Sequence, residues 1–249
     1  MPAGTPGGLQ AGGSLDVLGE RGVVMNPRLS IVMPVLDEAS TLGAALRELA
    51  PLRSQGVEVI VVDGDSSDGS AQAASGLADH VIAAARGRAS QMNAGAVRAS
   101  GDVLLFLHAD TRLPANASLA IDSALRRGRC WGRFDVEIEG RSWAFKLIAA
   151  LMNLRSRWSG IATGDQAIFV ERVAFAAVGG FPAQPLMEDI ELCKRLRRVG
   201  PPACLKTRVT TSGRRWERDG VWSTILLMWR LRLLYRLGVA PERLVRSYR

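Results

Sequence analysis

Two apolar runs in the first half of the chain lead straight into acidic residues. Residues 57–62 are followed by Asp63, Gly64 and Asp65, and residues 103–107 by His108, Ala109 and Asp110. A carboxylate at the end of a buried strand is well placed to accept hydrogen bonds from a ribose or a base. A divalent cation such as Mg²⁺ or Mn²⁺ prefers one or two carboxylates and takes its other ligands from water and substrate phosphates. We therefore expect a nucleotide site with a divalent metal at Asp110. His108 is either a second ligand, which favours Mn²⁺, or a residue that orients the loop.

Other interpretations of the acidic loop after residue 62 are weaker. An EF-hand calcium loop would need glycine where Asp68 stands and glutamate where Ala74 stands. A phosphatase-type aspartyl nucleophile would need a lysine at a suitable strand end, and the lysines at 146, 194 and 206 do not provide one. A helix cap explains Ser67 or Asp68 but leaves Asp63 without a role.

The elements that must position these residues alternate along the chain. Strands are expected at residues 29–33, 57–62, 80–83 and 102–107, with helices at about 40–49, 70–78 and 89–99 between them. This alternation predicts an α/β fold with a mainly parallel, Rossmann-like sheet and helices on both faces. In such sheets, ligands bind beyond the carboxyl ends of the strands.

The second half is less regular. It predicts helices at about 115–127, 142–158 and 189–199 and strands near 131–138 and 166–170. Residues 221–237 form a helical tail in which Trp222, Leu226 and Trp229 share a side with Leu233, and arginines are interleaved. The tail either packs on the domain or rests on an anionic membrane. The predicted organisation is a lead-in at 1–27, one catalytic domain at 28–216 and the tail at 217–249.

Charge and composition limit the function classes. The formal net charge is +8, but residues 190–249 carry 15 of the 32 basic and 4 of the 24 acidic residues, so residues 1–189 are slightly acidic. This distribution argues against a nucleic-acid binder, whose basic surface would give steeply salt-dependent affinity. The three cysteines form no C-x-x-C pair, and the N-terminus lacks a signal-peptide pattern. A cytoplasmic protein is expected, with peripheral contact at the inner face of the membrane left open.

Several segments in sequence order resemble a glycosyltransferase family. They are Pro34-Val-Leu-Asp37-Glu38, Val62-Asp63-Gly-Asp-Ser-Ser-Asp68-Gly69, Arg86-Gly-Arg88-Ala-Ser-Gln91-Met-Asn93-Ala-Gly95 and Leu107-His108-Ala109-Asp110-Thr111. Together they look like family 2 glycosyltransferases of the GT-A fold. Gly164-Asp165-Gln166, Gly179-Gly180-Phe181-Pro182, Met187-Glu188-Asp189 and Ser212-Gly-Arg214-Arg215-Trp216 resemble a small bacterial branch often associated with arsenosugar biosynthesis.

The resemblance implies a nucleoside diphosphate sugar as donor, UDP-linked by expectation, and a divalent metal, Mn²⁺ or Mg²⁺. It places the nucleotide on residues at the strand ends and the metal and diphosphate at Asp110. The expected nucleotide-sugar site comprises Pro34, Asp37, Glu38, Asp63, Asp65, Arg86, Arg88, Gln91, Asn93, His108, Ala109 and Asp110. Asp37 stands where family members commonly have asparagine, and His108 replaces the first acid of the usual D-x-D, so His108 and Asp110 are the metal candidates.

The resemblance also implies a catalytic base. Asp189, beside Glu188 at the start of a helix, is expected to take the acceptor proton, although acids at that position also complement the helix dipole. Gly164, Asp165 and Gln166 line the acceptor side or form a plain turn. Arg214, Arg215 and Trp216 are able to clamp a diphosphate or an anionic acceptor.

Two other functions compete with transfer. A sugar-phosphate nucleotidyltransferase would need a glycine-rich basic loop after the first strand, where this chain has Pro34 to Glu38 without glycine or lysine. A catalytically silent protein that binds nucleotide sugars is the other candidate. The shape of the pocket decides the donor sugar and the acceptor.

Overall fold

The strands of the first half lie side by side in one parallel unit. The structure is a computed structural model that describes residues 28–245, except the side chain of Arg215. β1 (Leu29–Val35) lies between β2 (Glu58–Asp63) and β4 (Val103–Phe106), and β3 (His80–Ala83) pairs with β2. All seven residues of β1 are buried, as expected for a strand covered on both faces. The predicted lead-in at residues 1–27 lies outside the described residues.

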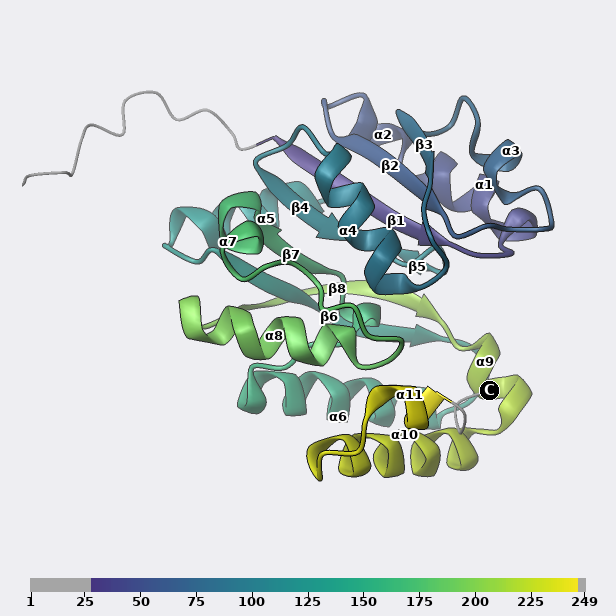
Figure 1. The fold of residues 1–249 in the computed structure, drawn as a ribbon, viewed down its shortest axis with the longest axis vertical. Coiled ribbons are helices and arrows are strands. Elements are labelled where there is room, and N and C mark those ends of the chain that lie inside the picture. Colours follow the sequence, from purple (N-terminus) through teal and green to yellow (C-terminus); the bar gives the residue numbers. More distant parts are fainter. Residues whose placement is uncertain (1–27, 246–249) are drawn as a thin grey trace, which may run out of the picture.

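The second half extends this sheet with antiparallel partners (Figure 1). β7 (Ile168–Glu171) runs antiparallel to β4, and β6 (Trp131–Glu139) runs antiparallel to β7. β8 (Ala203–Ser212) runs parallel to β6 and pairs with the short β5 (Thr111–Arg112). The resulting sheet is eight-stranded, in the order β3-β2-β1-β4-β7-β6-β8-β5, with both parallel and antiparallel pairs.

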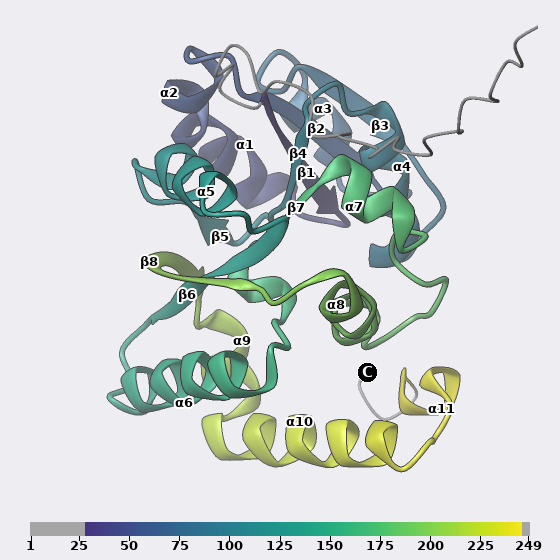
Figure 2. The same cartoon turned by 90° about the vertical axis from the view of Figure 1, so that its left-hand side faces the viewer.

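Helices cover both faces of the sheet, as predicted (Figure 2). On one face lie α1 (Ala39–Glu48), α2 (Ala50–Arg53), α3 (Ser70–Ala74), α5 (Ala117–Arg126) and α6 (Ala144–Ser159). On the other lie α4 (Arg88–Arg98), α7 (Arg172–Ala177) and α8 (Glu188–Val199). Side chains alternate between the two cores, so that Ile31 packs on the first face and Val32 on the second.

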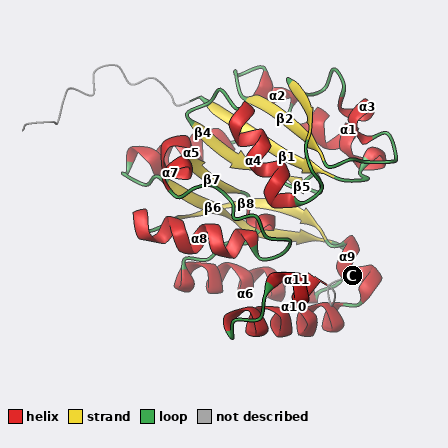
Figure 3. Ribbon diagram, in the orientation of Figure 1, coloured by secondary structure: helices red, strands yellow, loops and turns green. Residues whose placement is uncertain are grey.

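The described part of the chain ends with three helices: α9 (Arg214–Asp219), α10 (Val221–Arg236) and α11 (Pro241–Val245). Figure 3 shows them together as red ribbons below the yellow strands. Leu231 and Leu244 are buried against Leu186 and Met187, so one side of the tail docks on the loop before α8. The predicted boundary between residues 216 and 217 falls inside α9. Within residues 28–245, no helix is long and apolar enough to cross a membrane.

Three local predictions need correction. The helix expected to reach residue 78 ends at Ala74, where a turn takes over. The strand expected from residue 166 begins at Ile168, because Gly164–Gln166 form a 3₁₀ turn, η1, closed by Thr163 and Gln166. The ten-residue strand β8 was not predicted; its pairing with β6 and β5, distant in sequence, holds it in place.

Candidate active site

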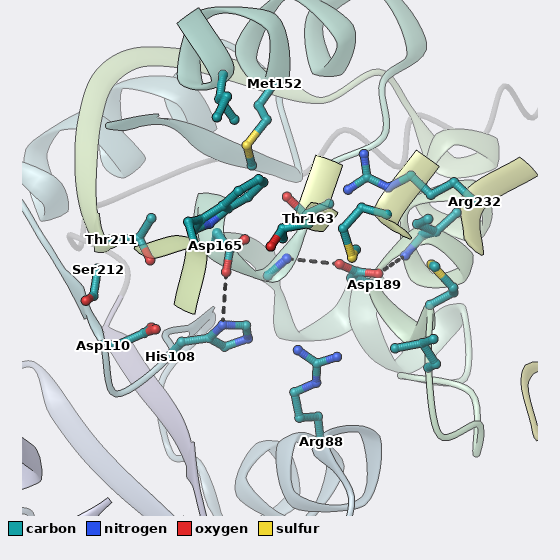
Figure 4. A pocket seen from close by; sticks show the side chains of 18 of the residues that line it. Arg88, His108, Asp110, Met152, Thr163, Asp165, Asp189, Thr211, Ser212 and Arg232 are labelled. Carbon is teal, nitrogen blue, oxygen red and sulfur yellow. Dashed lines mark hydrogen bonds and ion pairs between the residues drawn. The ribbon is translucent and has the colours of Figure 1, made fainter. Parts of the chain in front are cut away.

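The ends of β1, β4 and β8 open into one cavity of about 2120 Å³ (Figure 4). Val35 of β1 and Asp63 of β2 are register partners, so these two exits meet at one edge of the sheet. The cavity is walled by the β1 and β4 exits, the start of α4, α6, the loop before α8, and α10. Predicted site residues that line it are Pro34, Asp37, Glu38, Arg86, Arg88, Gln91, His108, Ala109, Asp110, Gly164, Asp165, Asp189, Arg214 and Trp216.

The remaining predicted site residues are placed differently. Asp63, Asp65, Asn93, Gln166 and Glu188 are not among the lining residues, and the side chain of Arg215 lies outside the description. The Asn93 amide exchanges two hydrogen bonds with the backbone of Phe181, at 2.9 and 3.0 Å, and so fixes the segment that leads to α8. The Gln166 side chain is buried, and its Nε2 donates to Asn153 Oδ1 at 3.3 Å.

The loops after β1 and β2 hold each other in place. The Asp37 N–H donates to Ser66 Oγ at 3.0 Å, and the Ser67 N–H donates to Asp37 Oδ1 at 2.8 Å. Asp68 Oδ2 accepts the Ala39 N–H at 2.8 Å, which satisfies a donor at the start of α1. The Ser70 hydroxyl, followed by the Ala39 N–H, lowers the pKa of Asp68. Asp37 and Asp68 therefore hold the two loops together. The N-cap residue of α3 is Gly69 rather than Ser67 or Asp68, although Asp68 Oδ1 accepts the Ser70 N–H at 3.0 Å.

Asp63 keeps one carboxylate oxygen without a protein donor. It is 8% exposed, and its Oδ2 accepts the Ser66 N–H at 3.1 Å. Its Oδ1 is buried and has no hydrogen-bond partner among the residues described. Such an orphaned oxygen is costly in a folded protein unless a ligand supplies the donor. Asp65 is exposed at φ 67°, and its carbonyl accepts from Arg86 Nη2 at 3.3 Å.

The Gln91 side chain connects the ends of β1 and β2 by hydrogen bonds to their backbone. Its Nε2 donates to Val35 O at 2.7 Å and to Val62 O at 2.8 Å. Gly64 makes room for it, because a Cβ at residue 64 would lie 2.9 Å from Gln91 Cδ. Gln91 therefore sets the separation of the two strand ends while it also lines the cavity.

At the β4 exit, His108 turns toward Asp165 and Asp110 toward the open cavity. His108 Nδ1 lies 3.5 Å from Asp165 Oδ1. Its ring packs on Gly164, where a Cβ would lie 2.3 Å from His108 Cε1. Burial alone would lower the pKa of His108, but the hydrogen bond and the charge of Asp165 outweigh it and raise the pKa above its ordinary value. The geometry gives His108 an orienting contact with η1.

The residues at the β4 exit fit a divalent cation that is shared with a substrate. Asp110 is exposed to the cavity, and its Oδ1 accepts from Thr111 Oγ1 at 3.2 Å. In the described part of the chain, no three His, Cys, Asp or Glu side chains form a ready-made metal site. One carboxylate beside a space large enough for a diphosphate is the arrangement in which phosphates and water complete the coordination of Mg²⁺ or Mn²⁺.

Asp189 occupies the opposite side of the cavity, in the first turn of α8. Its Oδ2 accepts the Gly164 N–H at 3.0 Å and its Oδ1 accepts the Ile190 N–H at 2.7 Å. Burial, followed by the charge of Glu188, raises the pKa of Asp189 to about 6, against the opposing effect of Arg88 and the two N–H donors. Met187, two residues before Asp189, adopts φ 65°. This is a strained backbone conformation of the kind found at functional sites.

Glu188 is buried next to the cavity and holds Arg88. Arg88 Nε lies 3.0 Å from Glu188 Oε1, and the glutamate side chain is 4% exposed. Arg88 begins α4 and reaches into the cavity (Figure 4). The two predicted catalytic acids thus have separate environments: Asp189 faces the cavity, whereas Glu188 fixes a cation beside it.

Two arginines that are not among the predicted site residues also line the cavity. Arg155 comes from α6 and Arg232 from α10, and Figure 4 shows Arg232 near Asp189. Arg155 Nη2 and Arg232 Nε are buried without hydrogen-bond partners within residues 28–245. Burial lowers the pKa of Arg155, and the charges of Asp189 and Asp165 act in the opposite sense. The sequence gives little indication that these arginines reach a site, because each is a cation among the apolar residues of a helix.

Comparison with solved structures shows a shared fold. A mannosyltransferase from Pyrobaculum calidifontis, solved with GDP-Man and Mn²⁺, is 18% identical with a TM-score of 0.62, covering 90% of this chain and 70% of its own. Glucosyl-3-phosphoglycerate synthase from Mycobacterium tuberculosis, solved with Mn²⁺, UDP and its product, is 20% identical with a TM-score of 0.58, covering 86% and 81%. Mannosyl-3-phosphoglycerate synthase from Rubrobacter xylanophilus is 20% identical with a TM-score of 0.54, covering 86% and 76%. A search of curated proteins finds no match.

The family profile described as glycosyl transferase family 2 matches residues 30–157. This match spans β1 to α6 and includes the exits of β1, β2 and β4, with Asp63 and Asp110. Asp189 lies beyond it, so its role depends on the geometry above. The mixed sheet with helices on both faces confirms the predicted GT-A fold. The chain belongs to glycosyl transferase family 2.

Proposed function

We propose that this glycosyltransferase moves a sugar, with inversion, from a nucleoside diphosphate sugar to an acceptor hydroxyl, and that the donor is UDP-linked. The observation that carries the proposal is the placement of Asp189, with a pKa raised to about 6, in the same cavity as Asp110. The structures solved with GDP-Man or UDP and with Mn²⁺ support the class of donor and the use of a metal.

The donor would bind at the β1, β2 and β4 exits. The orphaned Asp63 Oδ1 favours Asp63 over Asp65 as the acceptor of a hydrogen bond from the nucleoside. Asp110 would hold the divalent cation, with His108 kept in position by Asp165. The cation, when bound, offsets the negative charge that develops on the diphosphate. Arg88, anchored by Glu188, would add a fixed positive charge on the same side.

Asp189 would act as the general base. The acceptor O–H gives its proton to Asp189 as the acceptor oxygen forms a bond to the anomeric carbon. The bond from that carbon to the diphosphate oxygen breaks, and its electron pair leaves with the nucleoside diphosphate. A base with a pKa near 6 is ionised at neutral pH and still binds a proton well enough to assist, a contribution of about 10² to 10⁴-fold.

The acceptor would enter from the side formed by η1 and the tail. The Gly164 N–H orients Asp189, and Asp165 offers carboxylate oxygens to a hydroxyl-bearing acceptor. Arg214 and Trp216 line the same cavity and would contact an anionic part of the acceptor or the diphosphate. The segments between residues 164 and 216 support a place in the small bacterial branch associated with arsenosugar biosynthesis.

The test is a donor screen with the full chain. UDP-, GDP- and dTDP-sugars are incubated with Mg²⁺ or Mn²⁺, and release of nucleoside diphosphate is measured. We expect metal-dependent release, strongest from a UDP-sugar. No release and no thermal shift with any donor would refute the proposal.

Two variants separate transfer from the alternatives. Asp189→Asn should bind donor and metal but lose turnover, whereas Asp110→Asn should lose metal-dependent binding. A wild-type chain that binds donor without turning it over would instead be a silent nucleotide-sugar-binding protein. Release of pyrophosphate from a nucleoside triphosphate and a sugar phosphate would indicate a nucleotidyltransferase.

A further inference from the structure

Exposed apolar side chains are concentrated on two helices. Within residues 28–245, sixteen large apolar side chains are exposed, and ten of them lie on α6 and α10 or at their ends. On α6 they are Trp143, Leu147, Leu151, Leu154 and Trp158, and on α10 they are Trp222, Leu226, Trp229, Leu233 and Leu237. Each row repeats every three or four residues and so forms one stripe along its helix. We call these ten residues the α6–α10 face.

This face is not the exposed remainder of an ordinary surface helix. α10 is apolar on two sides: Leu231 is fully buried against the loop before α8, while Trp222 and Trp229 are 66% and 65% exposed. Packing of α10 on the domain therefore leaves a second apolar side of this helix uncovered. Rows of exposed tryptophan and leucine mark interaction sites, unlike single exposed apolar residues.

The charges of the two helices identify the partner. Neither α6 nor α10 contains an aspartate or glutamate, and together they carry six cations: Lys146, Arg155, Arg157, Arg230, Arg232 and Arg236. Lys146, Arg230 and Arg236 are exposed. A second copy of the chain docked through the same face would bring cations against cations. An anionic lipid surface instead satisfies both features, because arginine and lysine attract its headgroups and tryptophan prefers the interface between headgroups and acyl chains.

The catalytic cavity opens within this face. Leu151, Leu154 and Trp158 line it from α6, and Leu226, Trp229 and Leu233 line it from α10. Arg155 and Arg232, each with a buried guanidinium nitrogen that lacks a partner in the described part, lie on the same two helices toward Asp189. We propose that the protein binds to the surface of an anionic lipid bilayer through the α6–α10 face, with the mouth of its cavity turned toward the lipid.

Vesicle cosedimentation of the full chain, without donor, tests this proposal separately from the proposed reaction. The vesicles are phosphatidylcholine alone or phosphatidylcholine with phosphatidylglycerol at about 7:3. We expect binding to the anionic vesicles that weakens with salt. The double variant Trp143→Glu, Trp222→Glu lies on the face but outside the cavity lining, so it should lower the partition coefficient about tenfold or more. Its donor hydrolysis should be unchanged.

The matched control is Leu119→Glu, Val173→Glu. These residues are also exposed, on α5 and α7, and their replacement adds the same two negative charges. The control should bind vesicles like the wild type, and thermal melting checks that both variants fold. No binding to anionic vesicles, or equal loss in both variants, overturns the proposal. A dimer in light scattering that only the Trp143, Trp222 variant abolishes, without vesicle binding, would show instead that the face joins two copies.

Discussion

The environment of Asp189 makes a sharp prediction about pH. If Asp189 is the base, kcat/KM should follow its ionised fraction, with an acid limb near pH 6. Ionisation falls from about nine in ten at pH 7 to about one in ten at pH 5, so kcat/KM should fall about tenfold over that interval. Initial rates of nucleoside diphosphate release at subsaturating donor and acceptor measure it.

Two variants should move this limb in opposite directions. The charge of Glu188 raises the pKa of Asp189, so Glu188→Gln should move the midpoint below 6. Arg88 lowers that pKa, so Arg88→Gln should move the midpoint above 6, whatever it does to donor affinity. Glu191→Gln, later in α8 and paired with Lys194 at 3.2 Å, is the matched control and should leave the midpoint in place. Midpoints that move together, or that respond to Glu191 as much as to Glu188, would refute this account.

Three further predictions concern neighbouring residues. Gly164→Ala should lower kcat/KM about tenfold or more, because the new Cβ would lie 2.3 Å from His108 and displace the turn that orients Asp189. Gly200→Ala is the control and should leave kcat/KM unchanged, because a Cβ at residue 200 would meet no atom within 4 Å. Asp110→Asn should lower metal-stimulated turnover about 10² to 10³-fold. Calorimetry with Mn²⁺ and nucleoside diphosphate should show weaker binding to this variant than to the wild type. Unchanged metal-dependent binding would contradict the assignment of Asp110. Because the folded pKa of Asp189 is raised, its contribution to stability is present at low pH and lost as pH rises through about 6. The melting temperature of Asp189→Asn relative to wild type should therefore be higher at pH 8 than at pH 4, and a constant difference would contradict the raised pKa.

The strand-end part of the cavity could be predicted from sequence because its signals are local. Each strand there is a short apolar run, and the polar residue that follows it is fixed at the sheet edge by chain connectivity alone. The prediction of Asp63 and Asp110 as site residues rests on this connectivity, and the structure places Asp110, but not Asp63, in the cavity lining. What the sequence did not reveal is how neighbouring polar side chains divide their work: Asp37 and Gln91 use hydrogen-bonding atoms to hold the loops, while Asp63 keeps an oxygen without a partner.

The part of the cavity around Asp189 could not be predicted in the same way, because its contacts join segments that are distant in sequence. Asp189 is oriented by Gly164, 25 residues earlier, and Gly164 in turn packs on His108 of β4's exit. Arg155 and Arg232 meet the cavity only because α10 returns beside α6. Such contacts leave no periodic pattern, and β8 was missed for a related reason: its partners β6 and β5 lie far from it in sequence.

The distribution of charge connects the two halves of the molecule. The acidic first part carries its chemistry on carboxylates at strand ends, and the basic surplus follows Asp189 in the chain. Part of that surplus faces the cavity as Arg214 and Arg232, where it would meet phosphate or an anionic acceptor. Another part, including Arg236, lies exposed on a helix with exposed tryptophans, and Arg230 of the same helix is both exposed and part of the cavity lining. A basic surface that binds nucleic acid would not have its positive charge divided between the wall of a cavity and an apolar helix. The division instead fits the proposed enzyme, which would meet anionic groups twice, once on its donor and once on a lipid surface.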